Sequence, residues 1–312
     1  MIATVTLNPS LDEWMELSTL RVGVLNRASG FARYPGGKGI NVSRVIHALG
    51  GHTIAFALAG GEDGLILREL MNRLSIRHEF VTVEGPTRNN YKIRTTTPRA
   101  LTEINTAGPR VSRSSLHALA RRFFTHRPRP QAIAFSGSLP PGVPGSIYGR
   151  WIRTLRRLRI PTVLDTSGPA FRHGLAARPW LIKPNRDEAE EFLQRPLRRL
   201  DEIVRAARQL LRYGPEIVIV SLGRDGAVMA AASSNEVWLA PTIPVKAGTA
   251  VGAGDSLIGG FLVGWSRQLS AVSAFRLGVA CGTATAMSTG TELCRRSDVQ
   301  RVLRRVKLKR IG

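Results

Sequence analysis

The sequence predicts an α/β protein with a mainly parallel central sheet and helices on both faces of that sheet. Short apolar runs bounded by turn residues alternate with helical patterns along the chain. This alternation is typical of parallel strands, which need a crossover helix between them. Glycine-rich and polar clusters follow the strand-like runs, at the edge where open α/β sheets bind ligands. The predicted fold class therefore also locates a candidate site.

The predicted strands are short, apolar and bounded by turn residues, and the predicted helices have apolar residues at helical spacing. The strand-like runs are Ile2–Leu7, Thr53–Ala59, Ala132–Ser136, Pro161–Asp165, Trp180–Ile182, Ile217–Leu222 and Ala227–Ala231. The helical patterns are Ile40–Leu49, Gly64–Leu74, Ser114–Phe124, Ser146–Leu158, Asp187–Leu193, Asp201–Tyr213, Gly254–Ser266 and Val272–Met287.

Two stretches, Glu13–Tyr34 and Arg88–Ile104, interrupt the alternation of strands and helices. Both alternate polar and apolar residues without a helical pattern, and Tyr91–Thr95 has the pattern of a half-exposed strand. Both also adjoin candidate site residues. We expect these stretches to form a small β lid over the site, with residues 1–312 making one domain.

The composition favours a cytoplasmic protein without a membrane partner. Of the 312 residues 43% are hydrophobic, which is enough for one large core. No apolar run approaches the roughly 20 residues that a membrane helix needs. Met1–Leu7 lacks a basic region and a cleavage site, so we interpret it as a strand and not as a signal peptide. The two cysteines, Cys281 and Cys294, are too few for a disulfide framework and lack metal-ligand spacing.

The formal charge of +23, from 45 Lys and Arg against 22 Asp and Glu, is the strongest compositional feature. Such an excess can indicate nucleic-acid binding. The arginines are spread along the chain, however, in pairs such as Arg121-Arg122 and Arg156-Arg157 inside predicted helices, and no nucleic-acid motif accompanies them. We interpret them as solvated helix faces and expect no nucleic-acid partner. The positive field would also attract anionic substrates.

The sharpest motif is the run Thr249–Ser256, which contains Gly252, Ala253, Gly254 and Asp255 just before an apolar helical pattern. Small residues at a helix start let free backbone N–H groups approach an anion, aided by the helix dipole. An aspartate there can take the proton of an attacking hydroxyl, while the amides stabilise charge on a transferred phosphoryl group. The motif alone is equally compatible with a capping aspartate in a tight turn.

A second glycine cluster, Pro35–Ser43, opens a predicted helix and contains Gly36, Gly37, Lys38 and Asn41. It is not a Walker A motif, because the lysine is followed by glycine and not by serine or threonine. Glycines permit close approach of a ligand, and asparagine can both donate to and accept from sugar hydroxyls. Taken alone, the cluster is also compatible with an ordinary strand-to-helix turn.

Four more polar clusters end predicted strands. Asn8–Asp12 follows the first strand, where Asp12 could accept hydrogen bonds from two sugar hydroxyls, although an ordinary turn would have the same pattern. One such strand end means little, but several at one edge of a parallel sheet outline a cleft for a nucleotide and a substrate. The other three clusters are Ser136–Gly142, Lys183–Glu188 and Ser221–Gly226.

Together these motifs resemble, in order and over essentially the whole chain, the PfkB (ribokinase-like) carbohydrate kinase family. The resemblance is strongest to the branch with fructose-1-phosphate kinase, tagatose-6-phosphate kinase and the minor bacterial 6-phosphofructokinase. It implies a ribokinase-like fold, transfer of the γ-phosphate of ATP to a sugar phosphate, a requirement for Mg²⁺, and a homodimer formed through the lid. The motifs are Asn8–Asp12, Gly36–Asn41, Thr87–Asn89, Ser136–Pro140, Lys183–Glu188, Ser221–Gly223 and Gly252–Ser256.

The resemblance also implies roles for individual residues. Asp255 would be the general base, and the amides of Gly252, Ala253 and Gly254 would form the anion hole. The sugar would be bound by Asp12, Gly36, Gly37 and Asn41, and the phosphate already on it by Lys38 and Arg88, with Ser138 nearby. ATP would be bordered by Lys183, Asn185, Ser221, Gly223 and Gly226, and Glu188 would hold Mg²⁺ through water.

The sequence leaves several alternatives open. Ala250 replaces a threonine that is common in the family's monovalent-cation loop, so a role for K⁺ stays undecided. Thr87–Asn89 favours the tagatose-6-phosphate kinase pattern and Gly290–Cys294 the 6-phosphofructokinase pattern, while fructose 1-phosphate and fructose 6-phosphate are ranked first as substrates. A kinase of unphosphorylated sugars is the alternative within the enzyme class. From another class, a basic nucleic-acid-binding protein with an inactive kinase-like fold would not be expected to keep the complete Asp255 motif.

Overall fold

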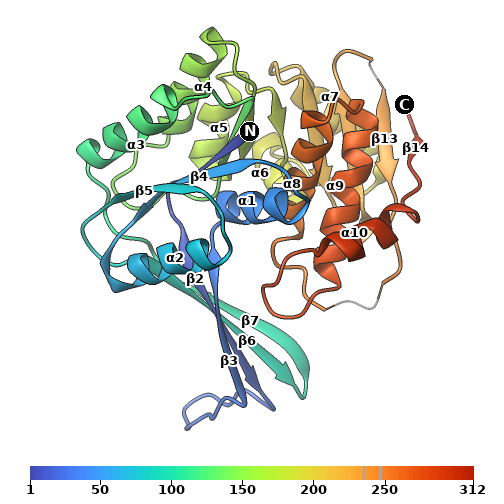
Figure 1. Cartoon of the computed structure of the whole chain (residues 1–312). Helices are drawn as coiled ribbons and strands as arrows, with labels where there is room; N and C mark the ends of the chain where they lie inside the picture. The colour runs from blue at the N-terminus through green and yellow to red at the C-terminus, as the bar shows by residue number, and fades with distance from the viewer. Residues whose placement is uncertain (235, 246–247) are drawn as a thin grey trace.

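A ten-stranded sheet forms the centre of the molecule (Figure 1). The computed structural model describes residues 1–234, 236–245 and 248–312. The strand order is β14-β13-β12-β11-β10-β9-β8-β1-β4-β5. Neighbours from β11 to β5 are parallel, and those from β11 to β14 are antiparallel. The strands are β1 (Ile2–Thr6), β4 (Thr53–Ala59), β5 (His78–Thr82), β8 (Ala132–Ser136), β9 (Thr162–Asp165), β10 (Leu181–Ile182), β11 (Ile217–Ser221), β12 (Ala227–Ala231), β13 (Val237–Ala240) and β14 (Lys309–Arg310).

Helices cover both faces of this sheet. On one face lie α3 to α7, and on the other α1 and α8 to α10. The helices are α1 (Lys38–Ala48), α2 (Gly61–Arg73), α3 (Arg113–Thr125), α4 (Ile147–Arg157), α5 (Gly168–Leu175), α6 (Arg186–Leu193), α7 (Leu200–Leu211), α8 (Ala253–Ser266), α9 (Ala271–Ala286) and α10 (Arg296–Leu303), with a 3-10 turn η1 at Gly223–Asp225.

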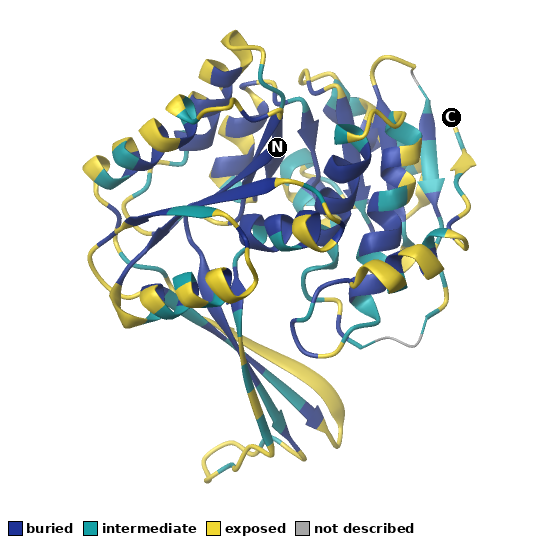
Figure 2. Ribbon diagram, in the orientation of Figure 1, coloured by how far each residue is buried: buried dark blue, intermediate teal, exposed yellow. Residues whose placement is uncertain are grey.

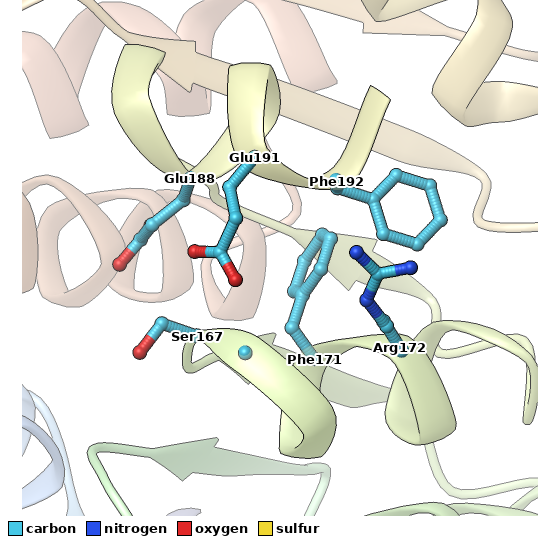
Figure 3. A pocket seen from close by; sticks show the side chains of 7 residues that line it. Ser167, Phe171, Arg172, Glu188, Glu191 and Phe192 are labelled. Atoms are coloured by element: carbon cyan, nitrogen blue, oxygen red, sulfur yellow. The ribbon is translucent and has the colours of Figure 1, made fainter. Parts of the chain in front are cut away.

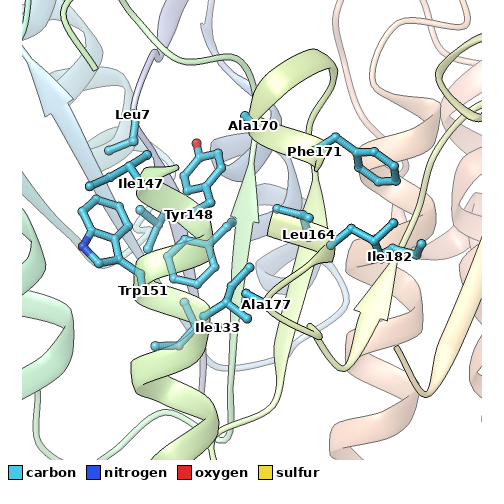
Figure 4. Close-up of a cluster of buried hydrophobic side chains, with 14 of the residues drawn as sticks. Leu7, Ile133, Ile147, Tyr148, Trp151, Leu164, Ala170, Phe171, Ala177 and Ile182 are labelled. Carbon is cyan, nitrogen blue, oxygen red and sulfur yellow. The ribbon is translucent and has the colours of Figure 1, made fainter. Parts of the chain in front are cut away.

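The apolar character of the strands on both sides explains this three-layer arrangement. Successive strand residues point to opposite faces, so β1 contributes Val5 to one core cluster and Ile2 to the other. Figure 4 shows Tyr148 and Trp151 of α4 in the first cluster, close to Ile133 of β8. Burial of such side chains stabilises the fold by roughly 1.5–3 kcal/mol each, which fixes the sheet as a rigid base for the loops at its edge.

A separate four-stranded sheet forms the lid, with strand order β3-β2-β6-β7. It projects from the body of the molecule, and β7 is exposed along its whole length (Figure 2). The base of the lid is anchored, because Leu11 of β2 packs with Leu67 and Met71 of α2. The strands are β2 (Ser10–Leu17), β3 (Gly30–Gly36), β6 (Arg88–Thr96) and β7 (Arg99–Asn105).

The structure confirms the predicted central sheet and its helices, and it places four strands in and beside the two stretches that were expected to form a lid. Each predicted strand and helix of the main body occurs within three residues of its expected bounds, and β2 begins at Ser10, before the predicted lid stretch. The prediction missed β5, β13, β14, α5 and α10, which are short or carry polar residues and owe their conformation to packing. None of the helices in the described ranges has the length and apolar character needed to cross a membrane.

Candidate active site

Asp255 lies in the first turn of α8, and its side chain is buried. The helix begins at Gly252, whose φ of +76° lies in the left-handed region that glycine tolerates best. A Cβ atom at Gly252 would also lie 2.6 Å from Leu293 Cδ2. This turn therefore needs glycine, and it brings the carboxylate next to the first amides of the helix.

The amides at the start of α8 differ in their availability. The N–H of Ala253 donates to the carbonyl of Ala250 at 3.1 Å, so this amide is not free, contrary to its expected place in the anion hole. The amides of Gly252, Gly254 and Asp255 have no recorded acceptor within the described ranges, as is usual for the first turn of a helix. The donors open to an anion therefore include the amide of Asp255 itself and exclude that of Ala253.

Two side chains of α1, Asn41 and Arg44, hold the carboxylate in place. Asn41 Nδ2 donates to Asp255 Oδ2 at 2.8 Å, and Asn41 Oδ1 accepts from Arg44 Nη1 at 3.1 Å. Arg44 also donates to the carbonyl oxygens of Pro35 and Thr291. Its guanidinium therefore fixes the orientation of the Asn41 amide and ties α1 to the lid and to the loop after α9. Asp255 Oδ1 is left to accept a proton.

Two lysines lie beside the start of α8 and share one carboxylate. Lys38 Nζ and Lys183 Nζ are each 3.3 Å from Oδ1 of Asp165, the last residue of β9. Lys38 Nζ is also 3.5 Å from Glu188 Oε1. A Cβ atom added to Gly254 would lie 3.2 Å from Lys183 Nζ, so this ammonium group borders the helix start directly. The fully buried Asp165 Oδ2 has no hydrogen-bond partner in the described structure.

The charges of this cluster tune the candidate base. Burial raises the pKa of Asp255 to about 6; the Asp165 carboxylate adds to the rise, and Lys38, the Asn41 hydrogen bond and Lys183 oppose it. Burial also disfavours the Asp165 carboxylate, but Lys183 and Lys38 together outweigh it and hold the pKa of Asp165 below its usual value. A carboxylate with a pKa near 6 is ionised at neutral pH yet accepts a proton readily.

Asp12 and its neighbours form the side of the site at the base of the lid. Asp12 Oδ1 accepts from Ser10 Oγ at 2.9 Å and from Asn90 Nδ2 at 3.2 Å. Gly36 lies opposite in β3, where a Cβ atom would come within 2.3 Å of Asp12 Oδ1. Gly37, at φ +110°, then turns the chain from β3 into α1. The second oxygen of Asp12 has no recorded partner in the described structure and can accept from a ligand hydroxyl.

Arg88 lies next to this group, at the start of β6, and forms no ion pair with the described residues. Arg88 Nε donates to the Asn8 carbonyl at 3.2 Å, and Asn8 Nδ2 donates to Ser138 Oγ at 3.2 Å. Burial lowers the pKa of Arg88, and the charge of Asp12 opposes this. The guanidinium is thus a partly buried cation that only neutral oxygens contact, which favours binding of an anion.

Asn185 and Glu188 form a reciprocal cap at the start of α6. Asn185 Oδ1 accepts from the Glu188 N–H at 2.7 Å, and Glu188 Oε2 accepts from the Asn185 N–H at 2.9 Å. Asn185 also bridges to Ser221 at the end of β11. Glu188 Oε1 is engaged by Lys38, so contact with a metal through water disturbs the cap least. Within the described ranges no group of three His, Cys, Asp or Glu side chains could hold a metal ion.

The two glycines expected to border ATP have different surroundings. Gly223 begins the exposed turn η1 with φ +59°, and a Cβ atom there would meet nothing within 4 Å. At Gly226 a Cβ atom would lie 2.0 Å from the Ala240 carbonyl oxygen of β13. Gly226 is therefore required by the β12–β13 contact, which provides a structural reason for this glycine apart from nucleotide binding.

Two hollows border the cluster. Figure 3 shows a small one between α5 and α6, where Glu188 and Glu191 extend toward Ser167. A larger cavity, of about 390 Å³, lies on the other side of Arg44 and is lined by Tyr34, His47 and Leu293 among others. Arg44 thus separates this cavity from the Asn41–Asp255 pair.

Sequence reasoning assigned no role to four residues of the site, namely Asn8, Arg44, Asn90 and Asp165, although Asn8 belongs to the Asn8–Asp12 motif. Arg44 could have been found, because it lies three residues after Asn41 and so on the same helix face. Asp165 ends a predicted strand, as several predicted site residues do. Asn8 contacts Arg88 and Ser138, and Asn90 contacts Asp12. These partners are far away in sequence, so single motifs do not reveal the contacts.

Comparisons with known proteins show the family of this chain. The model of the pfkB family carbohydrate kinases matches residues 5–298. The 1-phosphofructokinase of Bacillus subtilis (strain 168) is 36% identical over 311 residues, covering 100% of both chains. The ATP-dependent 6-phosphofructokinase isozyme 2 of Mycobacterium tuberculosis (strain ATCC 25618 / H37Rv) is 33% identical over 302 residues, 96% of this chain and 88% of that relative.

Solved structures show the same fold. Phosphofructokinase-2 from Escherichia coli in complex with substrates and products superposes with a TM-score of 0.92 at 29% identity, covering 98% of this chain and 99% of that chain. Fold and site together define a phosphotransferase acting on carbohydrates. The chain belongs to the pfkB family of carbohydrate kinases, and its fold is ribokinase-like, as expected.

The raised pKa of Asp255 predicts an acidic limb in the pH profile. If the ionised carboxylate is the base, kcat/KM should fall about tenfold per pH unit below pH about 6, because protonation removes the base. The measurement is steady-state kcat/KM from pH 4.5 to 8. Asp165→Asn should shift the limb to lower pH, since it removes a negative charge that raises the pKa of Asp255. If the acidic limb stays at the same pH in Asp165→Asn, the limb does not report the ionisation of Asp255.

Substitution of Arg44 should disturb the base without touching a ligand directly. In Arg44→Met the Asn41 amide loses the donor that orients it, so its hydrogen bond to Asp255 weakens. Because that bond lowers the pKa of Asp255, the acidic limb should move to higher pH and kcat should fall by roughly tenfold, the effect of about 1.4 kcal/mol. Arg73→Met, on an exposed helix, is the matched control. If the acidic limb of the pH profile stays at the same pH in Arg44→Met, Arg44 does not orient Asn41 toward Asp255.

Proposed function

We propose that this kinase transfers the γ-phosphoryl group of ATP to a hydroxyl of a phosphoketohexose, with fructose 1-phosphate as the first candidate and fructose 6-phosphate as the second. The observation that carries the proposal is the buried Asp255 beside free helix amides and two lysines. The product is a ketohexose bisphosphate. The preference for fructose 1-phosphate rests on relatives named 1-phosphofructokinase in Bacillus subtilis and Escherichia coli.

In the proposed mechanism Asp255 takes the proton of the attacking hydroxyl through Oδ1 while Asn41 holds Oδ2. The amides of Gly252 and Gly254 and the ammonium group of Lys183 stabilise the charge on the transferred group. Phosphoryl transfer needs mainly positioning and electrostatic stabilisation from the protein. A rigid helix start with a fixed carboxylate supplies both.

The proposal places the existing phosphate of the sugar at Arg88. Its guanidinium has no carboxylate partner in the described chain and donates to the carbonyl of Asn8, whose side chain contacts Ser138. Asp12, with one oxygen free, would bind sugar hydroxyls together with Asn41. Lys38 is half exposed and paired with Asp165 and Glu188, which favours the γ-phosphate as its ligand.

Glu188 would hold Mg²⁺ through water, since a direct bond would break its cap or its pair with Lys38. When bound, Mg²⁺ neutralises charge on the ATP phosphates. Mg²⁺ commonly keeps several waters and only one or two carboxylate contacts, which fits a single glutamate here. One solved neighbour is described as a complex with potassium, and a K⁺ ion at backbone carbonyls near Ala250 is a subsidiary proposal.

We further propose a cytoplasmic, single-domain enzyme that dimerises through its lid. The lid exposes apolar side chains, including Phe31, Leu101 and Ile104, and surfaces of this kind favour protein contacts. A neighbour from Escherichia coli is described as a tetrameric inhibited form, so higher assembly is a further option for relatives of this fold.

The decisive experiment combines a base substitution with product analysis. Asp255→Asn should lower kcat by about 10²–10⁴ while leaving ATP affinity within a few fold, because the amide keeps the shape but cannot take a proton. Wild-type enzyme should release ADP with fructose 1-phosphate faster than with fructose 6-phosphate, tagatose 6-phosphate or free fructose, and NMR should show a 1,6-bisphosphate. Wild-type turnover in Asp255→Asn would show that Asp255 is not the general base. A preference for free fructose would instead indicate a kinase of unphosphorylated sugars.

The proposed phosphate contact has its own test. Arg88→Ala should raise KM for the sugar phosphate by about 10²-fold, equivalent to the loss of a charge-assisted contact of up to about 3 kcal/mol, and change KM for ATP little. Steady-state kinetics with each substrate varied gives both values. Equal changes in the two constants would argue that Arg88 supports the lid and does not bind phosphate.

A further inference from the structure

The acidic residues are unevenly distributed along this chain. Between Glu103 and Asp165 there is no Asp or Glu, while the same stretch holds eleven arginines. All eleven are exposed, and Asp165 itself is buried in the active site. The stretch, which spans α3, α4 and their loops, thus contributes eleven of the 23 net positive charges.

The topology gathers many of these arginines at one edge of the sheet. The loops that precede β8, β9 and β10 are adjacent because these strands are neighbours and parallel. They lie at the amino ends of the strands, opposite to the edge that carries Asp255. Together with the end of α4 they form what we call the arginine edge, which consists of Arg127, Arg129, Arg156, Arg157, Arg159 and Arg178.

The arginine edge has no acidic partners among the described residues, unlike arginines elsewhere. On other helices Arg73 pairs with Glu69 at 3.0 Å and Arg205 with Asp201 at 2.8 Å, and Arg301 pairs with Asp298. The nearest acids along the edge, Glu79 and Glu216, flank it, and Glu79 contacts His126. The outer faces of α3 and α4 are exposed in Figure 2. The C-terminal end of a helix favours a nearby cation. That effect explains an arginine at the end of α4, but it does not explain six arginines without a carboxylate partner in the described ranges.

The side chains at this edge define the chemistry of a partner. Arginine binds phosphate through paired N–H groups, and the stretch between Glu103 and Asp165 contains no lysine. Leu158 is the exposed large apolar residue of the edge, which gives too little apolar surface for insertion into a membrane. One exposed aromatic side chain, Tyr213, lies beside Gly214, which abuts Arg178, but its ring packs edge-on against Phe192, so the described edge offers no row of rings for stacking on single-stranded bases. The phosphate backbone of a nucleic-acid duplex can be bound by charge alone, so it matches the chemistry of this edge best.

We propose that the arginine edge binds duplex nucleic acid through its phosphate backbone, without sequence preference. The surface lies away from the catalytic edge, so binding and phosphoryl transfer use separate parts of one molecule. This inference does not depend on which sugar phosphate the kinase uses, and it reverses the expectation of no nucleic-acid partner that the sequence motifs suggested.

The test measures binding of the full-length protein to a fluorescein-labelled random-sequence DNA duplex, by anisotropy over a series of NaCl concentrations. The edge variant is Arg156→Gln/Arg157→Gln/Arg159→Gln. The control variant, Arg73→Gln/Arg205→Gln/Arg301→Gln, removes the same charge from arginines that are paired with acids. ADP release and thermal unfolding are measured for each protein, and both variants should retain wild-type turnover.

For the wild-type protein log K should fall linearly with log salt concentration. Each phosphate contact contributes about 0.9 to the slope, so the edge variant should lose about 2–3 of that slope and the control variant less than about 1. Equal losses in the two variants would reduce the effect to net charge and overturn the proposal. So would tighter binding to phosphatidylglycerol vesicles than to the duplex, complete displacement by inorganic polyphosphate at matched phosphate concentration, or no salt-dependent binding at all.

Discussion

The structure depends on keeping one carboxylate, Asp255, ionisable at a helix start inside the protein. Burial alone would favour its neutral form, and a nearby second acid adds to this effect. The opposing contacts come from separate elements: Asn41 and Lys38 from α1, and Lys183 from the loop after β10. The parallel sheet makes this possible, because the carboxyl ends of β9 and β10 lie at the edge where α1 and α8 begin.

Arg44 shows how the site is linked to the parts of the molecule that can move. Its guanidinium joins the Asn41 amide to a carbonyl of β3 and to a carbonyl of the loop after α9. A shift of the lid strand would therefore reach Asp255 through only three hydrogen bonds. This link explains why a residue that contacts no substrate in our proposal should still affect the proton affinity of the base.

The sequence alone predicted the central sheet, most helices and the polar clusters of the site, because strand and helix periodicities are strong in this chain. It failed where a role depends on partners distant in sequence. Ala253 was predicted as an anion donor from its motif, but Ala250 already accepts its N–H. Gly226 matched a nucleotide motif, yet the β13 backbone alone requires a glycine there. Asn90 was invisible because only the pairing of β2 with β6 brings it to Asp12.

The antiparallel end of the sheet has a consequence for the behaviour of the protein in concentrated solution. An uncovered outer strand offers unpaired backbone groups to other chains and is a common route to aggregation. Here β14 pairs with β13 and presents two cationic side chains, Lys309 and Arg310, and Arg310 contacts Glu236 at 3.0 Å. A short, charged outermost strand repels a second copy at this border, so the kinase is protected against sheet-to-sheet polymerisation there.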